Sequence, residues 1–457
     1  MFRKTKHIHF IGIGGIGMSG MAELLFRLGY DISGSDHQSS DRTLHLEKIG
    51  IDMFIKHHQK NIANADVVVY SSAITKDNIE ILFAQDNKIP VIRRAELLGE
   101  LLKVKKTSIA IAGTHGKTTT SSMLGLILLE AELNPTLVIG GIVNKFNTNA
   151  ISGSGDIILV EADEFDRTFL SLKPTISVIN NLDLEHLDCY NNLEDLQLAF
   201  IQFANSVPFY GLISLCIDSA NVKDIIKDIK RPFITFGTTK EASISAQNIK
   251  YDKLGSTFEL YQNHTFIDNI SLNMPGEHNV LNSLAAISIA LELNINIDII
   301  KKTLQNYSGV RRRFELKYET LNGVDIIDDY AHHPSEVNAT INAAKLGWNK
   351  RIISIFQPHL FTRTRDFYKE FAESFIKSDI VIITDIYPAR ENPIKGITSK
   401  LIVDELLQLG HRNVHYIPSP LSLPIFIKEL ELNNDIILVM GAGNIWRICD
   451  NIYQEIK

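Results

Sequence analysis

The segment that most restricts how this chain can fold is IAIAGTHGKTTT, residues 109–120. Four apolar residues typical of a buried strand lead into a turn with two glycines, and a helix-like segment, residues 121–132, follows. A strand, a glycine turn and a helix in this order bind nucleotide phosphates, because backbone N–H groups face the anion and the start of the helix carries positive potential. The eight-residue form of such loops would place a glycine at position 111, where the chain has Ile111, so this is a shortened variant, G-T-x-G-K-T. We therefore predict an ATP site here.

Each residue type in this loop has a chemical task. The ammonium group of Lys117 reaches the terminal phosphates, and the hydroxyl of Thr118 is a ligand for Mg²⁺. The predicted ATP-binding residues are those of the loop and the start of the helix: Gly113, Thr114, His115, Gly116, Lys117, Thr118 and Thr119.

A second glycine motif follows the strand-like run HIHFI near the N-terminus. Gly12, Gly14 and Gly17 give G-x-G-x-x-G at the start of a helix-like segment, and Asp36 ends the next strand-like segment. In this pattern a diphosphate lies at the helix N-terminus and the acid binds a ribose hydroxyl. The same geometry serves NAD or another nucleotide diphosphate such as a UDP-sugar, and it also occurs as a tight turn without a ligand. The motif alone leaves these alternatives open.

The length of the chain and its repeated pattern indicate several domains. At 457 residues it is too long for one ordinary core, and roughly two to four domains are expected. Residues 1–106, 107–310 and 311–457 each alternate continuous apolar strands with amphipathic helices, which is typical of parallel sheets covered on both faces. Weak alternation in residues 240–275 predicts a small antiparallel hairpin in the middle stretch. The predicted fold class is α/β.

The composition argues against several classes of protein. A formal net charge of −7 argues against broad electrostatic attraction to nucleic acid. No apolar run reaches the roughly eighteen residues of a membrane span, and His7 and His9 interrupt the N-terminal apolar stretch, unlike a secretory signal. Cys189, Cys216 and Cys449 have no paired spacing, so neither a disulfide framework nor a thiolate metal site is indicated. We predict a cytoplasmic protein, either a monomer or a weak homodimer.

Acidic residues follow the apolar run DIILV of the middle stretch. Glu161 ends this run, next to the phosphate loop, where a magnesium ion finds the oxygen ligands it prefers. Asp163, Glu164 and Asp166 come next, and a solvated acidic loop accounts for at least two of these four acids. Further on, His186 lies in LDLEHLD; because imidazole is an unusual ligand for magnesium, the residues alone favour a structural or general-base role.

Two polar clusters follow strand-like runs in the third stretch. They are DDYAHHP, residues 328–334, and QPHLFTRTRDF, residues 357–367. Together they supply donors for a carboxylate and acceptors for a ribose or an ammonium group. As a cluster they predict a binding site at the strand ends.

Taken in order, these segments resemble the Mur ligases. The match runs over nearly the whole chain and comprises GIGGIG, SSAI, GTHGKTTT, EADEFD, the histidine of LEHLD, MPGEHNVLN, RRRFE, DDYAHHP, QPHLFTRTRDF and GAGNIW. The resemblance implies a Rossmann-like UDP-substrate domain (1–106), a P-loop-like ATP domain (107–310) and a Rossmann-like domain that binds the amino acid and closes on ATP (311–457). It implies that the carboxylate of UDP-N-acetylmuramate attacks ATP and that L-alanine attacks the resulting acyl phosphate, in peptidoglycan biosynthesis.

The resemblance also implies roles for individual residues. Thr118 and Glu161 resemble ligands of one magnesium ion, and His186 resembles the ligand of a second ion. Lys117 and Arg313 resemble residues at the ATP phosphates, Asn279 at the adenine and Asp329 at the ribose. The residues implied at the amino acid are Tyr330, His332 and Arg363, and those at the sugar nucleotide are Gly12, Gly14, Gly17, Asp36, Ser71 and Ser72.

The chain departs from the family pattern at two positions. Glu277 stands in P-G-E-H-N where the family has a basic residue, and Leu360 stands in P-H-L-F-T-R where it has an arginine. The second change weakens the case for L-alanine over glycine or L-serine. Three alternatives to this reading are a related ligase that attaches a recycled peptide, an NAD-dependent oxidoreductase, which leaves GTHGKTTT unexplained, and a non-catalytic nucleotide-binding module.

Overall fold

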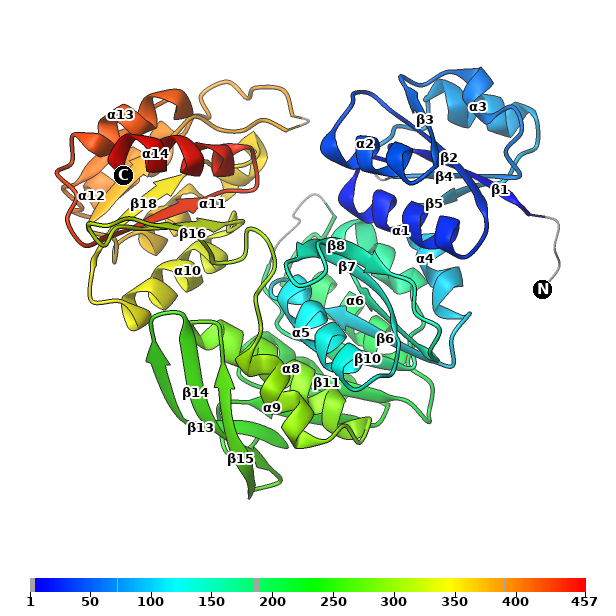
Figure 1. The fold of residues 1–457 in the computed structure, drawn as a ribbon, viewed down its shortest axis with the longest axis horizontal. Helices are drawn as coiled ribbons and strands as arrows, with labels where there is room; N and C mark the ends of the chain where they lie inside the picture. The colour runs from blue at the N-terminus through cyan, green and yellow to red at the C-terminus, as the bar shows by residue number, and fades with distance from the viewer. Residues whose placement is uncertain (1–4, 72, 185–188, 390) are drawn as a thin grey trace. The chain divides into compact units, whose positions relative to one another are not determined.

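The computed structural model describes residues 5–71, 73–184, 189–389 and 391–457. The chain divides into two compact units. The first comprises Met1–Gln247, Leu260–Asp268 and Leu281–Leu304, and the second comprises Asn248–Glu259, Asn269–Val280 and Gln305–Lys457. Within the described residues the strands form three sheets (Figure 1).

The first sheet has the strand order β3-β2-β1-β4-β5, and all its neighbouring pairs are parallel. Its strands are β1 (His7–Ile11), β2 (Asp31–Asp36), β3 (Asp52–Ile55), β4 (Val67–Tyr70) and β5 (Val91–Arg93). The helices between them are α1 (Ile16–Arg27), α2 (Asp41–Lys48), η1 (Gln59–Ile62), α3 (Ile79–Asp86) and α4 (Arg94–Leu102). Because β2 and β4 flank β1, the order of strand addition reverses at β1, and such reversal points bind ligands beyond the strand ends. The glycine loop follows β1 at this point.

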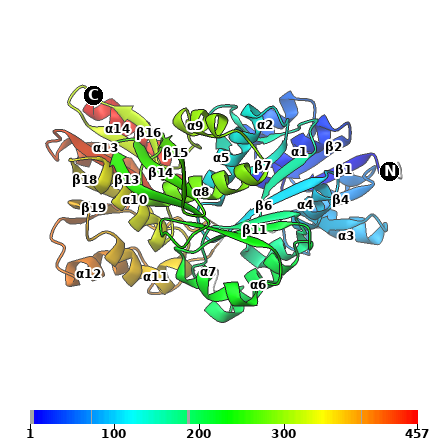
Figure 2. The same ribbon diagram turned by 90° about the horizontal axis from the view of Figure 1, so that it is seen from below.

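The second sheet is mixed, in the order β15-β14-β13-β12-β11-β10-β6-β9-β7-β8. The strand before the phosphate loop, β6 (Thr107–Ala112), lies between β10 (Ile176–Ile179) and β9 (Ile157–Glu161), parallel to both. Further strands are β7 (Thr136–Val143), β8 (Thr148–Ile151), β11 (Leu212–Cys216) and β12 (Phe233–Gly237). The helices along this part of the chain are α5 (Lys117–Glu130), η2 (Phe165–Ser171), α6 (Leu193–Asn205), α7 (Ala220–Ile225), η3 (Ile226–Asp228), α8 (Glu277–Glu292) and α9 (Ile297–Gln305). Figure 2 shows α5 on one face of β6 and β11, with α6 and α7 on the other.

The antiparallel addition expected in residues 240–275 has three strands rather than two. They are β13 (Ile244–Asp252), β14 (Gly255–Gln262) and β15 (Thr265–Leu272), joined by two-residue turns. Asn263 and His264 in the second turn have φ angles of 47° and 67°. Two left-handed residues match the twist of flanking strands in such turns, and asparagine tolerates this conformation well.

The third sheet has the order β16-β17-β21-β18-β19-β20, parallel except for the antiparallel pair β16 and β17. Its strands are β16 (Glu315–Glu319), β17 (Asp325–Asp329), β18 (Arg351–Phe356), β19 (Ile380–Ile383), β20 (Val414–Tyr416) and β21 (Asp435–Met440). Its helices are α10 (Pro334–Gly347), α11 (Phe361–Ser374), α12 (Lys400–Gln408), η4 (Pro420–Ser422), α13 (Leu423–Lys428), η5 (Ile445–Arg447) and α14 (Ile448–Ile456).

Burial explains why the inner strands are continuously apolar. Every residue of β21 is buried, and in β9 the four residues before Glu161 are buried, as expected when helices cover both faces of a sheet. The structure thus confirms an α/β fold dominated by parallel sheets with an antiparallel addition. Among the described residues, no helix combines the length and the apolar character that crossing a bilayer requires.

Candidate functional site

The phosphate loop joins β6 to α5 and has glycine at two positions where other residues fit poorly. Gly113 and Gly116 have φ angles of 133° and 79°, a region in which other residues are strained. A Cβ at Gly116 would lie 2.2 Å from Asn282 Oδ1, and one at Gly113 would lie 3.1 Å from the backbone nitrogen of Asn180. The shortened loop therefore keeps the tight backbone path of a phosphate-binding turn without a glycine at position 111.

Lys117 is held by the protein itself. Its Nζ donates to the carbonyl oxygens of Gly113, at 2.6 Å, and Thr114, at 3.2 Å, and to Glu164 Oε2 at 2.7 Å. The Glu164 side chain is 1% exposed and that of Lys117 16%. A carboxylate this deeply buried needs a charged partner, so the ammonium group stabilises Glu164 as much as Glu164 positions the ammonium group.

The oxygen atoms expected to bind a metal ion lie beside each other at the start of α5 and the end of β9. The Thr118 hydroxyl donates to Glu161 Oε2 at 3.1 Å, and Gly140 N donates to Glu161 Oε1 at 2.5 Å. A Cβ at Gly140 would lie 2.5 Å from Glu161 Oε2. Hydroxyl and carboxylate oxygens are ligands that a hard divalent cation prefers, so these two residues fit one. His186 lies outside the described residues, among which no three His, Cys, Asp or Glu side chains are grouped to hold a metal.

The other predicted residues of the loop fasten it to the segment after β10. His115 N donates to Asn181 Oδ1 at 2.7 Å, and the Thr114 hydroxyl exchanges hydrogen bonds with the backbone of Asp183. His115 Nε2 lies 3.3 Å from Asp183 Oδ2. Thr119 is buried in the first turn of α5. These contacts give Thr114 and His115 a clear structural role in holding the loop.

The N-terminal glycine loop is built on the end of β2. Gly12 N and Ile13 N both donate to Ser35 O, at 2.8 and 3.1 Å, and Gly14 N donates to Asp36 Oδ2 at 2.8 Å. Gly12 has a φ of 77°, and a Cβ there would lie 3.2 Å from Ser71 Oγ. Asp36 therefore supports the loop itself. Ser72 lies outside the described residues.

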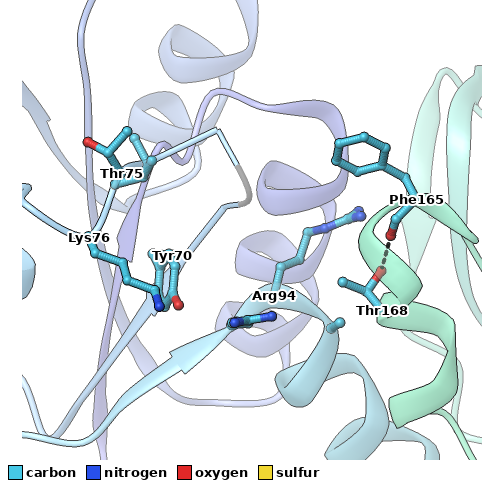
Figure 3. Close-up of a pocket in the computed structure, with 9 residues that line it drawn as sticks. Tyr70, Thr75, Lys76, Arg94, Phe165 and Thr168 are labelled. Carbon is cyan, nitrogen blue, oxygen red and sulfur yellow. Dashed lines mark hydrogen bonds between the residues drawn. The ribbon is translucent and has the colours of Figure 1, made fainter. Parts of the chain in front are cut away.

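A pocket of about 330 Å³ lies in the same unit. It is lined by Tyr70, Ile74, Thr75, Lys76, Arg93, Arg94, Ala95, Phe165 and Thr168. Figure 3 shows Tyr70, Thr75 and Lys76 on one side, Phe165 and Thr168 on the other, and Arg94 between them. A Cβ at Gly17 would lie 2.3 Å from the Arg94 guanidinium, so the helix of the glycine motif passes directly beside this pocket. One lysine and two arginines make the pocket suited to an anion.

In the second unit, Asp328 and Asp329 at the end of β17 are buried carboxylates. Asp329 accepts hydrogen bonds from Phe314 N at 2.8 Å and Ala331 N at 2.7 Å. Burial raises the pKa of Asp329 to about 6, although the Arg313 charge opposes this. Burial also raises the pKa of Asp328 to about 7, against the charge of Arg312, whose Nε lies 3.5 Å from Asp328 Oδ2.

The predicted amino-acid residues gather near these carboxylates. Arg313 lies over the Tyr330 ring, 5.2 Å from its centroid, and 3.6 Å from Glu336 Oε1. His332 Nδ1 lies 3.0 Å from both Tyr330 O and Glu336 Oε2. The rings of His332 and His359 are 6.1 Å apart. Arg313, from the segment before β16, and Tyr330 and His332, from the segment after β17, thus lie together beside Glu336.

Two further predicted residues lie in the first turns of helices in this unit. In α11, the Nη1 atom of Arg363 lies 3.5 Å from His359 Nδ1. Asn279, at the start of α8, is 2% exposed and donates to Pro275 O at 2.7 Å. Leu360 has a φ of 72°, and Glu391 accepts hydrogen bonds from Phe361 N and Thr362 N just after it.

Models of three domains of one protein family match the chain. They are the catalytic domain of the Mur ligase family over residues 7–106, the Mur ligase middle domain over residues 111–290, and the glutamate ligase domain of Mur ligases over residues 312–443. The chain belongs to the Mur ligase family.

Individual relatives of this Mur ligase are similar along its whole length. It is 45% identical over 457 residues to the UDP-N-acetylmuramate–L-alanine ligase of Geotalea uraniireducens, covering 100% of this chain and 99% of the relative. It is 45% identical over 456 residues to the ligase of the same name from Salinibacter ruber, covering 99% and 96%. The crystal structure of the UDP-N-acetylmuramate–alanine ligase of Thermotoga maritima matches with a TM-score of 0.83 at 29% identity, covering 99% of this chain and 100% of that one.

Several residues that shape this Mur ligase site escaped the sequence motifs. Glu164 was noticed only as one of four acids, and Glu336 and the arginines of the pocket, Arg93 and Arg94, were not singled out. A basic pair directly at the end of an apolar strand was the signal for the arginines. For Glu164 the sequence carries no such signal, because its contact with Lys117 is set by tertiary packing. Glu336 accepts hydrogen bonds from His332 N and His333 N, so the local capping pattern at the start of α10 was its signal.

Proposed function

We propose that this Mur ligase joins L-alanine to the carboxylate of UDP-N-acetylmuramate, converting ATP to ADP and phosphate, in cytoplasmic peptidoglycan biosynthesis. The observation that carries the proposal is similarity over the full length, at 45% identity, to enzymes of that name. In this proposal residues 1–106 bind the sugar nucleotide and residues 107–310 bind ATP. Residues 311–457 bind the amino acid and close on ATP.

The chemistry runs in two steps. A carboxylate is a poor acyl donor, so an oxygen of the sugar carboxylate first attacks the γ-phosphorus of ATP, and ADP leaves. The amine of L-alanine then attacks the carbonyl carbon of the acyl phosphate, loses a proton, and displaces inorganic phosphate as the amide forms. Exclusion of water during both steps protects the acyl phosphate from hydrolysis.

The phosphate loop supplies the positive charge for the first step. Lys117 and the backbone N–H groups of residues 113–118 bind the β- and γ-phosphates and stabilise the charge on the transferring group. Thr118 and Glu161 would hold Mg²⁺, which neutralises charge on the phosphates when bound. Asn279 contacts the adenine, Asp329 the ribose and Arg313 the phosphates. His186 is the proposed ligand of a second magnesium ion.

The sugar nucleotide contacts residues of the first unit. The backbone of Gly12, Gly14 and Gly17 binds the diphosphate at the start of α1, where the helix dipole favours an anion. The pocket lined by Lys76, Arg93 and Arg94 takes a further anionic part of the same substrate.

The amino acid contacts the second unit. Arg363 binds the carboxylate of L-alanine as a fork of two donors. Tyr330 and His332 lie around its amine and side chain. Because Leu360 supplies no second guanidinium, a single arginine carries the recognition of the carboxylate, and the discrimination between L-alanine, glycine and L-serine depends on the space around Tyr330.

An assay of ADP release tests this proposal directly. We expect ADP only when UDP-N-acetylmuramate and L-alanine are both present, with ¹⁸O from the sugar carboxylate recovered in the phosphate. ADP release that is indifferent to the sugar nucleotide would contradict the proposal. So would a tripeptide that replaces L-alanine with higher kcat/KM, which would indicate a peptide-recycling ligase. Glycine and L-serine as competitors measure the effect of Leu360.

A further inference from the structure

A buried carboxylate lies behind the N-terminal glycine loop without touching it. Glu80, in the first turn of α3, is fully buried. The Ser35 hydroxyl donates to its Oε2 at 2.6 Å, and His58 N and Asn61 Nδ2 donate to its Oε1 at 3.0 and 2.7 Å. Such a carboxylate is expensive to bury, so its complete set of donors indicates a specific structural task.

Histidines complete the group around this carboxylate. His57 Nδ1 lies 3.3 Å from Glu80 Oε2 and 2.9 Å from Ser35 Oγ. His9 Nε2 lies 3.7 Å from Glu80 Oε2, and His9 Nδ1 lies 2.8 Å from Ser33 Oγ. Burial raises the pKa of Glu80, but nearby His9 and the hydrogen bonds from Ser35 and His58 N outweigh burial and lower it to about 2. Glu80 is therefore a carboxylate at neutral pH.

Ser35 connects this group to the loop. Its side chain is fixed by Glu80 and His57, while its backbone oxygen accepts hydrogen bonds from both Gly12 N and Ile13 N. The next residue, Asp36, accepts from Gly14 N. The end of β2 thus serves as the template for the loop, and Glu80 fixes that end from the side of α3.

We propose that Glu80 is a positioning residue for the sugar nucleotide: through Ser35 it holds the backbone of residues 12–14 in the shape that binds the diphosphate. A loop that binds an anion through backbone N–H groups depends on their directions, because its affinity comes from donors already aligned before the ligand arrives. The inference rests on the proposed function, since it names the substrate that this loop binds.

The test compares three variants by direct binding and by kinetics. Glu80→Gln keeps the size of the side chain but removes its charge, and Ser35→Ala removes the link to the loop. Glu23→Gln is the matched control. Glu23 is a buried carboxylate in α1, a helix that packs on the same sheet, and it pairs with Arg27 and His45. Calorimetric titration measures the Kd of UDP-N-acetylmuramate without ATP or L-alanine, and initial rates give kcat and each KM.

We expect Glu80→Gln to raise the Kd and KM of UDP-N-acetylmuramate about tenfold, because the charge-assisted hydrogen bond from Ser35 to Glu80 is lost. We expect Ser35→Ala to raise both about threefold, because the backbone of Ser35 stays in place without its side-chain hydrogen bond. The KM values of ATP and L-alanine stay within about twofold, because uniform loss of sugar-nucleotide binding leaves the other substrates unaffected. Glu23→Gln leaves the Kd of the sugar nucleotide unchanged.

The opposite results are equally clear. An unchanged Kd in Ser35→Ala would overturn the proposal even if Glu80→Gln failed to fold, and so would an equal rise in Glu23→Gln, which would indicate general destabilisation. A wild-type protein that binds the sugar nucleotide but releases no ADP would contradict the proposed function, while the binding comparison would still decide the role of Glu80. A wild-type protein that does not bind it would overturn both.

Discussion

The two glycine loops of the first unit are held in shape in different ways. The loop after β6 is followed by a cation, Lys117, at the start of α5. A buried acid from the segment after β9, Glu164, contacts this cation directly. The loop after β1 has no charged side chain between Gly12 and Gly17. It is shaped by backbone hydrogen bonds to Ser35 and by the Asp36 carboxylate, with Glu80 behind them.

Under the proposed function, this difference separates a loop that takes part in a reaction from one that only binds. Charge that stabilises a transferring phosphoryl group must be held in place before the reaction, and a buried cation needs a partner when no nucleotide is present. A diphosphate that undergoes no chemistry needs only fixed donors. Glu164 therefore contacts the cation of its loop, whereas Glu80 contacts Ser35 at the end of the strand that supports its loop.

Replacement of Lys117 should have the largest effect. Lys117→Ala is expected to lower kcat about a thousandfold, because charge on the transferring phosphoryl group loses its main side-chain partner. It should also destabilise the fold, by about 3 kcal/mol, because the buried carboxylate of Glu164 loses its ammonium partner. ADP release and thermal unfolding measure the two effects.

The double variant Lys117→Ala with Glu164→Gln separates them. It should recover most of the stability while kcat stays low, because the buried negative charge is removed together with its ammonium partner. A double variant as unstable as Lys117→Ala would show that the ion pair is not the source of the loss.

Acid titration should distinguish Glu80 from its neutral replacement. Its pKa is lowered to about 2 from a usual 4.5, so its stabilisation is fully present above pH 4.5 and is lost as the pH falls through that interval towards 2. Linkage gives roughly 3 kcal/mol for such a shift. Urea unfolding of wild-type protein and Glu80→Gln at pH 7, 5 and 3 should therefore show a difference that shrinks below pH 5. A difference that stays constant with pH would contradict the low pKa.

Substitution of Gly116 and Gly12 by alanine compares how well each loop tolerates an added Cβ. Gly116→Ala places a Cβ 2.2 Å from Asn282 Oδ1, whereas Gly12→Ala places one 3.2 Å from Ser71 Oγ; both φ angles are positive. We expect kcat/KM for ATP to fall about fiftyfold in the first variant, and KM for the sugar nucleotide to rise about fivefold in the second. Equal losses would mean that backbone strain, rather than the close contact, dominates.

The smallest effect is expected at Asp36. Asp36→Asn can still accept the Gly14 N–H through its amide oxygen, so the loop keeps its shape and loses only a charge. We expect KM for the sugar nucleotide to change by about threefold or less. A tenfold rise would instead favour direct contact between Asp36 and the ribose.

The sequence was sufficient for those parts that are local in the chain. Strand, glycine turn and helix are consecutive at both loops. The sequence therefore predicts a turn at residues 12–17 and another at residues 113–118, and the structure has both. Glu164 and Lys117 are 47 positions apart, and Glu80 and Ser35 are 45 apart. These pairs depend on which strands become neighbours, and no short motif encodes that. The weakly alternating stretch STFELYQNHTFIDNISLNM covers β14 and β15, so the strand that the hairpin prediction omits is β13, Ile244–Asp252.

The site residues carried over from the family stay predictions. Tyr330, His332 and Arg313 meet around Glu336, an arrangement compatible with a shared task. Leu360 shows why a departure from the pattern is hard to interpret from the sequence. Its φ of 72° and the carboxylate of Glu391 beside the next two N–H groups belong to the local backbone, which the letters P-H-L-F-T-R do not specify.

The contact between Gly140 and Glu161 sets a limit on how this chain can diverge. Any side chain at position 140 would push the carboxylate away from the Thr118 hydroxyl, although Gly140 lies on β7, Glu161 on β9 and Thr118 on α5. In a library of every single substitution selected for cell-wall growth, position 140 should accept no residue but glycine, although Gly140 itself is exposed.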